Sequence, residues 1–169
     1  MAPTSIMAPT FISAPIFISA PTNILRGDNA KPAAAARTKR GIKEPRIVVI
    51  RTGRIVIRAR LRETATAERI WTQLPLYSTA EVWGAAVHFE THTETGREPS
   101  ARQNVKAGEI GYWVEDDRVI IGYGMTPISK AGEIRMPSPV NVWADALDDV
   151  ALLGAVKPGQ RVSLLQADS

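Results

Sequence analysis

The sequence predicts a mainly β domain, either a closed antiparallel barrel or a sandwich, behind an N-terminal segment of different composition. After residue 45, about eight short apolar segments alternate with turn-forming residues, and only two short stretches have helical spacing. Short strands at regular intervals favour a barrel or a sandwich over a parallel α/β sheet. The length of 169 residues is enough for one domain with its own core.

Residues 1–45 are expected to form a disordered, low-complexity extension, and residues 46–169 the folded domain. A short phrase containing Ala-Pro recurs through residues 1–22, and prolines at this spacing interrupt helices and sheet ladders alike. No positive charge precedes the apolar part, which is a poor fit to a secretory signal. A transit peptide or a tether to an anionic surface is an alternative. The Arg-Gly-Asp triplet that starts at Arg26 resembles an integrin-binding motif, but so short a match also arises by chance.

The basic character of the chain belongs to its first segment. The net charge is +4, but residues 1–46 carry seven Lys and Arg against two acids, whereas residues 47–169 carry fourteen against fifteen. The folded part offers no basic face by composition, so nucleic-acid binding is not expected of it, and association through residues 26–46 is a separate hypothesis. The chain has no cysteine and no apolar run of the roughly 20 residues that a membrane-spanning helix needs. We expect a cytoplasmic protein without disulfides or a membrane partner.

The first strands after the extension form a predicted β-hairpin. Residues 47–50 are a continuous apolar run, Thr52-Gly53 supplies a turn, and residues 55–62 alternate between apolar and mostly basic side chains. This alternation indicates a strand with one buried and one exposed face. The arginines of the exposed face are interpreted as solvated charges rather than as a phosphate-binding stripe: Arg58, Arg60 and Arg62.

Helical spacing and turn residues predict the remaining elements. Residues 64–73 form a predicted helix that ends before Pro75, with Trp71 in the core. Residues 91–107 form a long polar loop, a length that is uncommon unless the loop is functional or mobile. The later predicted strands occupy residues 109–113, 119–123, 140–145 and 161–166, and the second helix occupies residues 147–153.

The predicted strand from Trp83 to Glu90 places apolar side chains on one face. His88, Glu90 and, beyond the strand, His92 share the other face, which is expected to be exposed. These are ligand types for a divalent metal, but side chains about 7 Å apart along a strand do not reach one ion without a bend. No metal is expected, and a metal-dependent or hydrolytic enzyme built on these three residues is kept as an alternative.

Several spaced motifs occur in order between residues 83 and 162. They are Trp83-Gly84, Gly108-Glu109-Ile110-Gly111-Tyr112-Trp113, Gly124-x-Thr126-Pro127-x-Ser129, Ile134, Ser138-x-Val140-Asn141-Val142 and Lys157-x-Gly159-x-x-Val162. Together they resemble the small bacterial and archaeal cyclophilin-like proteins, over residues 46–166. The resemblance implies a closed cyclophilin-like β-barrel of about eight strands with two short helices. Members of that family mostly have no assigned reaction.

The resemblance does not extend to the isomerase signature of true cyclophilins. That chemistry needs a guanidinium that holds the prolyl carbonyl and stabilises a twisted amide. The strand similar to the one that bears this arginine reads VHFE at residues 87–90, and the next arginine is Arg97 in the loop. Ile128 and Pro139 stand where the resemblance leads us to expect a tryptophan and a histidine.

An apolar groove is the part of a cyclophilin-type site that the sequence still supports. Its predicted apolar lining is Phe89, Tyr112, Trp113, Tyr123, Met125 and Ile128, and its predicted polar groups are Thr126, Ser138 and Asn141. Apolar walls with a few polar groups are typical of a site for a small molecule or a peptide. We therefore expect a domain that binds a proline-containing peptide or a small ligand, with little or no isomerase activity and no cofactor.

Other interpretations of these residues remain open. One is an active peptidyl-prolyl isomerase that recruits Arg97 or Arg102 from the polar loop. Part of the predicted groove can also belong to the core, because neighbouring strand residues such as Tyr112 and Trp113 point to opposite faces. Asn141, which lies among apolar neighbours, can equally satisfy a buried backbone group.

Overall fold

The computed structural model describes residues 43–168. Most of the expected extension over residues 1–45 lies outside this range, as does the whole Arg-Gly-Asp triplet. The nucleic-acid hypothesis for residues 26–46 also falls outside it, except for residues 43–46. Of the two units into which the chain divides, the one that carries the fold begins at Pro45. Within the described range, no helix is long and apolar enough to cross a membrane.

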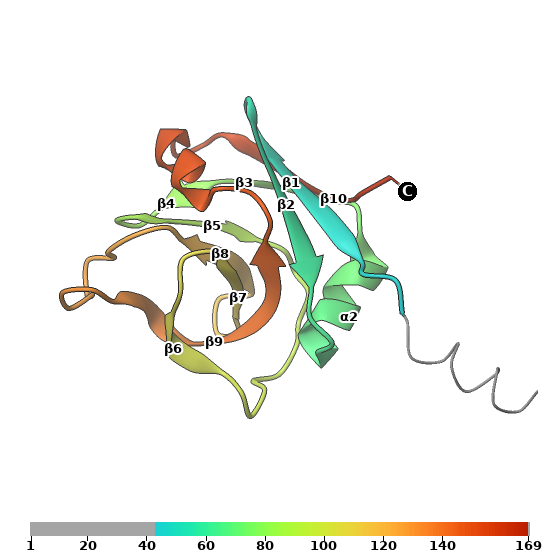
Figure 1. Ribbon diagram of the computed structural model, residues 1–169, viewed down its shortest axis with the longest axis horizontal. Coiled ribbons are helices and arrows are strands. Elements are labelled where there is room, and N and C mark those ends of the chain that lie inside the picture. Colours follow the sequence, from blue (N-terminus) through green and yellow to red (C-terminus); the bar gives the residue numbers. More distant parts are fainter. Residues whose placement is uncertain (1–42, 169) are drawn as a thin grey trace, which may run out of the picture. The chain divides into compact units, whose positions relative to one another are not determined.

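The strands form one antiparallel sheet that curls into a nearly closed barrel (Figure 1). Along the sheet the order is β3-β10-β1-β2-β9-β7-β8-β5-β4, and β6 pairs with β9 outside this path. The strands are β1 (Ile47–Thr52), β2 (Ile55–Leu61), β3 (Leu76–Thr79), β4 (Glu81–Val82), β5 (Ala86–Glu90), β6 (Arg102–Val105), β7 (Glu109–Trp113), β8 (Arg118–Gly122), β9 (Ile134–Ala146) and β10 (Arg161–Gln166). Helix α2 (Ala65–Gln73) and a 3-10 helix, η1 (Val150–Ala155), accompany them. The predicted mainly β barrel is confirmed.

The β1–β2 hairpin follows its prediction closely, because both its turn and its alternation are encoded locally. Gly53 opens the turn with a φ of 59°, which glycine adopts without steric cost. Ile57, Ala59 and Leu61 of β2 are buried, and the residues between them are exposed. The buried set of β2 therefore forms one wall of the core.

The interpretation of the β2 arginines as solvated charges is wrong for Arg62. This side chain is one third exposed, and its Nη2 lies 2.6 Å from Asp145 Oδ1. Arg58 is exposed but forms a bidentate pair with Asp148, with contacts of 2.7 and 3.0 Å. Hydrogen bonds from Arg58 lower the pKa of Asp148 to about 2. The two arginines thus tie β2 to the end of β9 and the segment after it.

Helix α2 confirms the helix predicted over residues 64–73. Thr64 is its N-cap residue, and the Thr64 hydroxyl accepts a hydrogen bond from Ala67 N at 3.1 Å. Ala67 and Ile70 face the core, whereas Trp71 is only half-buried. Trp71 packs against the edge of the core, and the guanidinium carbon of Arg46 lies 5.4 Å from its ring centroid, so a cation covers part of the indole.

Three strands were not predicted, and several boundaries were placed wrongly. Strand β9 begins at Ile134 rather than at residue 140, and β5 begins at Ala86 rather than at Trp83. The long polar loop contains β6, whose sequence RQNV has almost no strand pattern and whose conformation depends on pairing with β9. Strands β3 and β4 are too short to show a period. The second helix begins at Val150 rather than at residue 147. Asp149 is its N-cap residue, and the Asp149 side chain accepts a hydrogen bond from Ala151 N at 2.9 Å.

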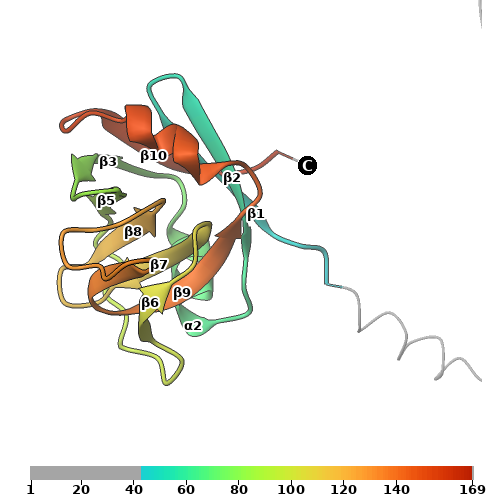
Figure 2. The same cartoon turned by 60° about the vertical axis from the view of Figure 1, so that its left-hand side comes forward.

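The sheet has an inner core and a second apolar layer on its outer face. The largest buried side chains of the inner core include Trp143, Tyr112, Phe89, Ile50 and Ile57. The second cluster consists of Ala86, Val105, Ile120, Met136, Val140 and Val142, with Trp113 and Ile134 packed against it. Figure 2 shows β6 and β9 alongside β7 and β8, where this outer layer forms.

Two glycines permit the outer layer to pack closely. A Cβ atom at Gly122 of β8 would lie 2.4 Å from Cγ2 of Ile134, and one at Gly111 of β7 would lie 2.7 Å from Cγ2 of Val140. Because of this layer, β5 is buried on both faces. The prediction of an exposed face around His88 is therefore wrong, since His88 is only 9% exposed.

Candidate functional site

The residues of the predicted groove do not share one surface. Phe89 and Tyr112 are 1% and 0% exposed, and both belong to the inner core. Each is paired with Val119 of β8, so the barrel interior holds both rings. Trp113 points the other way and packs against the outer layer. The aromatic lining predicted from sequence is thus divided by the sheet itself.

Asn141 is also fully buried, and its amide is used by the protein. Its Oδ1 accepts from Glu98 N at 2.8 Å, and its Nδ2 donates to Thr66 Oγ1 at 2.9 Å and to Gly96 O at 2.8 Å. No donor of this side chain is left for a ligand. Asn141 links the polar loop to β9 and α2 through hydrogen bonds. It therefore satisfies backbone groups, which was the alternative to ligand binding for this residue.

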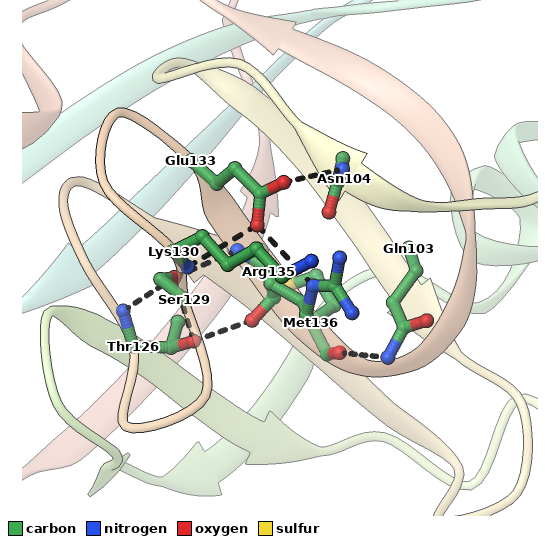
Figure 3. Close-up of polar contacts among 8 residues, drawn as sticks. All are labelled: Gln103, Asn104, Thr126, Ser129, Lys130, Glu133, Arg135 and Met136. Carbon is green, nitrogen blue, oxygen red and sulfur yellow. Dashed lines mark hydrogen bonds and ion pairs between the residues drawn. The ribbon is translucent and has the colours of Figure 1, made fainter.

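The remaining predicted residues cluster around a turn that we call the Thr-Pro turn, residues 125–129. Thr126 is 4% exposed and donates from Oγ1 to Arg135 O at 2.5 Å. Ser129 Oγ accepts from Thr126 N at 3.0 Å and from Arg135 N at 2.9 Å (Figure 3). These hydrogen bonds lock the turn to the start of β9. Met125 and Ile128 are left 55% and 45% exposed on it.

The Trp83-Gly84 motif supports the same turn from the other side. Gly84 has a φ of 60°, and a Cβ atom there would lie 2.7 Å from Cδ of Pro127. The following residue, Ala85, donates from its backbone N to Met125 O at 3.0 Å. Two motifs that lie far apart in sequence therefore have one structural purpose, a close contact that only glycine allows. Tyr123, which precedes the turn, is half-buried against the inner core.

A polar network extends from the Thr-Pro turn across β9 to β6 (Figure 3). The carboxylate of Glu133 accepts from Lys130 N at 3.2 Å, from Arg135 Nε at 3.3 Å and from Asn104 Nδ2 at 3.4 Å. The hydrogen bond from Lys130 N is the main cause that lowers the pKa of Glu133. Gln103 Nε2 donates to Met136 O at 2.9 Å. The network leaves the guanidinium of Arg135 partly in solvent, with a side-chain exposure of 30%.

A second charged cluster on the outer face was not predicted. Arg118 Nη1 lies 3.2 Å from His88 Nδ1 and 3.1 Å from Glu81 Oε1. The His88 ring meets Trp113 edge to face with centroids 6.2 Å apart. Burial, followed by the charge of Arg118, lowers the pKa of His88, which favours a neutral ring that accepts from Arg118. The cluster follows from the sheet register, in which Arg118 pairs with Trp113 and His88 pairs with Glu81.

The metal-dependent alternative finds no assembled ligands. His88 is turned toward Arg118, whereas His92 is exposed with its Nδ1 3.6 Å from Glu90 Oε1 and 4.0 Å from Asp117 Oδ2. Within residues 43–168, no group of three or more His, Cys, Asp or Glu is placed to hold a metal ion.

The two loop arginines of the isomerase alternative are both bound to carboxylates. Arg97 pairs with Glu115, which also accepts from the hydroxyl of Ser138 at 2.7 Å. Arg102 pairs with Glu109, which is 8% exposed. Burial tends to raise the pKa of Glu109, but hydrogen bonds from Lys106 N and two arginines outweigh it, so the pKa lies below its ordinary value. Both guanidinium groups serve to hold the loop in place.

Two hollows lie elsewhere, over β1, β10 and β3. One is lined by Arg51, Gly53, Tyr77, Ser78, Thr79, Arg161, Val162 and Ser163, and the other by Val49, Arg51, Leu74, Pro75, Leu165, Gln166, Ala167 and Asp168. None of the predicted groove residues lines either hollow. At the Thr-Pro turn, Met125 and Ile128 form an exposed apolar surface.

Comparison with known proteins finds a matching family model and solved structures with a similar fold. A family model described as Cyclophilin-like matches residues 46–165. A hypothetical protein from Archaeoglobus fulgidus, known from its solution structure, is 28% identical with a TM-score of 0.64, over 73% of this chain and 95% of that chain. McbB in complex with tryptophan is 14% identical with a TM-score of 0.55, over 72% of this chain and 45% of that chain, so it supports the fold alone. No curated protein matches the chain.

Proposed function

Because the chain belongs to the cyclophilin-like family, we propose that its barrel binds a short proline-containing peptide or a small carbonyl-bearing ligand at the Thr-Pro turn. Little or no isomerase activity accompanies this binding. The observation that carries the proposal is the guanidinium of Arg135. Its Nε contacts Glu133 at 3.3 Å, but its two Nη atoms have no hydrogen-bond partner among residues 43–168. These donors are available to a ligand carbonyl.

The apolar part of the surface comes from the turn itself. Met125 and Ile128 are among the few large apolar side chains that are more than 40% exposed in the described chain. The hydrogen bonds of Thr126 and Ser129 hold the turn in one conformation. A ligand therefore meets apolar side chains on a backbone that is already ordered, which reduces the entropic cost of binding. A proline ring, which carries no backbone N–H, suits such a surface.

Binding is favoured over catalysis because of where the charges lie. Isomerase chemistry needs a guanidinium that acts in a dry, low-dielectric site. Arg135 is 30% exposed and stands at an open surface. Arg97 and Arg102, the loop arginines of the alternative, have carboxylate partners in Glu115 and Glu109. Each would have to give up an ion pair before it could stabilise a twisted amide.

The test is a titration of the full chain with proline-containing peptides, followed by amide chemical shifts. Shifts are expected in the Thr-Pro turn and in residues 103–104 and 134–136. Replacing Arg135→Gln removes the available donors and is expected to weaken binding about tenfold. Arg60→Gln is the matched control, because Arg60 is exposed on β2 and makes no ion pair within residues 43–168. Equal effects of the two variants would contradict the proposal.

A prolyl-isomerase assay on the same samples separates the two candidate functions. The rate is expected to stay near the uncatalysed rate for the unmodified protein. Catalysis well above it that is lost in Arg97→Ala or Arg102→Ala would favour the isomerase instead. Shifts confined to residues outside the Thr-Pro turn would move the ligand site elsewhere.

A further inference from the structure

The outer face of β1, β10 and β3 carries a surface that the peptide proposal does not use. Its first hollow has a volume of about 630 Å³. Sheet register places Arg51 opposite Ser163, which is in turn opposite Tyr77, and it places Arg161 opposite Thr79. Antiparallel partners share a face, so these side chains form one row across three strands and an adjacent row across β10 and β3. In the sheet, β10 lies between β1 and β3.

In the part of the chain that the structure describes, neither of the two arginines of this hollow has an acidic partner, a property that they share with Arg60 of β2. Arg51 and Arg161 are exposed, and neither has a carboxylate within 4.0 Å among residues 43–168. The strand arginines Arg58, Arg118 and Arg135 are all paired with acids. Arg161 lies two residues from Ser163, the partner of Arg51, on β10. Arg51 and Arg161 are therefore diagonal neighbours on the sheet, with backbones about 7–8 Å apart. Long side chains at that spacing can converge on one anion.

Hydroxyl groups complete the polar side of the hollow. Ser163, Ser78 and Thr79 line it together with Tyr77, which is 74% exposed. The hydroxyl groups of Ser163, Tyr77 and Thr79 share the face of the two arginines and can donate hydrogen bonds to an oxyanion, whereas Ser78 pairs with the buried Val162. The combination of two cations and several neutral donors, without an acid in the lining, fits a negatively charged oxygen group.

A second hollow of about 610 Å³ adjoins the first and shares Arg51 with it. Val49, Leu74, Pro75 and Leu165 give it an apolar wall, and Arg51, Gln166 and Asp168 contribute polar groups. Asp168 also lines it, so an anionic head would be repelled from this second hollow. The carboxylate of Asp168 therefore favours an anion at Arg51 and Arg161, with apolar atoms over Val49 and Leu165.

We propose that this face binds a small amphipathic anion. A carboxylate or phosphate head lies between Arg51 and Arg161, and a short hydrocarbon part covers Val49 and Leu165. The surface shares no residue with the Thr-Pro turn, so this proposal stands independently of the peptide-binding proposal.

The test is a set of titrations of the full chain followed by amide chemical shifts, with octanoate, octyl phosphate, octanol and inorganic phosphate as probes. Octanoate and octyl phosphate are expected to shift residues of β1, β10 and β3, and the tighter of the two identifies the head group. Octanol and inorganic phosphate each lack half of the recognised chemistry and are expected to bind at least tenfold more weakly. Raising the salt concentration is expected to weaken octanoate binding.

Variants separate a built site from general positive charge. Arg51→Gln and Arg161→Gln are each expected to weaken the binding of the preferred anion about tenfold. Arg54→Gln removes the same charge one residue beyond Gly53, outside both hollows, and is expected to change binding less than twofold. An equal loss in Arg54→Gln would overturn the proposal, as would octanol binding as tightly as octanoate. Binding only to vesicles that contain anionic lipid, with none to the monomeric probes, would also overturn it.

Discussion

At the scale of single residues, absent side chains are as important as those present. Gly122 lies directly beneath Ile134, and Gly111 lies beneath Val140, so the strands under the outer layer present bare backbone at these points. His88 shows the opposite case, a titratable ring that is covered by the same layer and held beside Arg118. Each of these positions gives a measurable consequence.

Replacing Gly122→Ala is expected to destabilise the domain by about 1–3 kcal/mol, because the added methyl group would lie 2.4 Å from Cγ2 of Ile134. Gly96→Ala is the matched control, since a Cβ atom there meets nothing within 4 Å and the backbone has no positive φ. The control is expected to be neutral or slightly stabilising. Chemical denaturation of both variants measures the difference, and equal stabilities would contradict the packing argument.

His88 makes the free energy of unfolding depend on pH. Its pKa is lowered in the folded state, so below the ordinary value of 6.5 the unfolded chain binds a proton that the folded chain does not. Stability is therefore full above about pH 6.5 and is expected to fall as the pH drops toward 5. His88→Gln is expected to flatten this slope, whereas His92→Gln at an exposed position should retain it. Denaturant midpoints measured between pH 5 and 7 provide the comparison.

At the scale of elements, the polar loop of residues 91–101 is held by side chains rather than by strand pairing. Asn141 reaches it through Glu98 N and Gly96 O, and Glu98 in turn accepts from Thr66 Oγ1 at 2.6 Å. The same dependence on partners explains which elements could be predicted. The β1–β2 hairpin has its own turn and alternation, whereas β6 is a strand only because β9 lies beside it.

Asn141→Ala is expected to cost about 2–3 kcal/mol of stability, because it removes a fully buried amide and leaves Glu98 N, Gly96 O and Thr66 Oγ1 without this partner. The amide of Glu98 is expected to exchange with solvent faster than in the unmodified protein. Asn104→Ala serves as the control, since this exposed side chain makes one long hydrogen bond of 3.4 Å. Hydrogen exchange that is unchanged at Glu98 in Asn141→Ala would show that the loop is held in some other way.

At the scale of the whole molecule, the sheet exposes two separate surfaces through different strands. The Thr-Pro turn belongs to the connection between β8 and β9, whereas the anion surface lies on β1, β10 and β3. The barrel and the turn could be predicted from motifs and periodicity. The division of Phe89 and Tyr112 from Trp113 could not, because it depends on which face of the sheet becomes the interior. Pairing of arginines with acids was equally beyond sequence, since Arg62 and Glu109 meet only after the barrel closes.

Because the two surfaces share no residue, their ligands are expected to bind independently. Saturation with octanoate should leave the dissociation constant of a proline-containing peptide within about twofold of its value without octanoate. The reciprocal titration checks the same coupling. A larger change in either direction would show that the barrel transmits a conformational change between the two faces.

The burial of β8 on both faces also determines which amino-acid substitutions this strand tolerates. On β2, every second residue faces solvent, so random single substitutions should be tolerated with a period of two along the strand. On β8, residues 119–122 are all buried, so tolerance to substitution is not expected to alternate along this strand. In a saturation library selected for folded protein, β8 should appear as a continuous intolerant block.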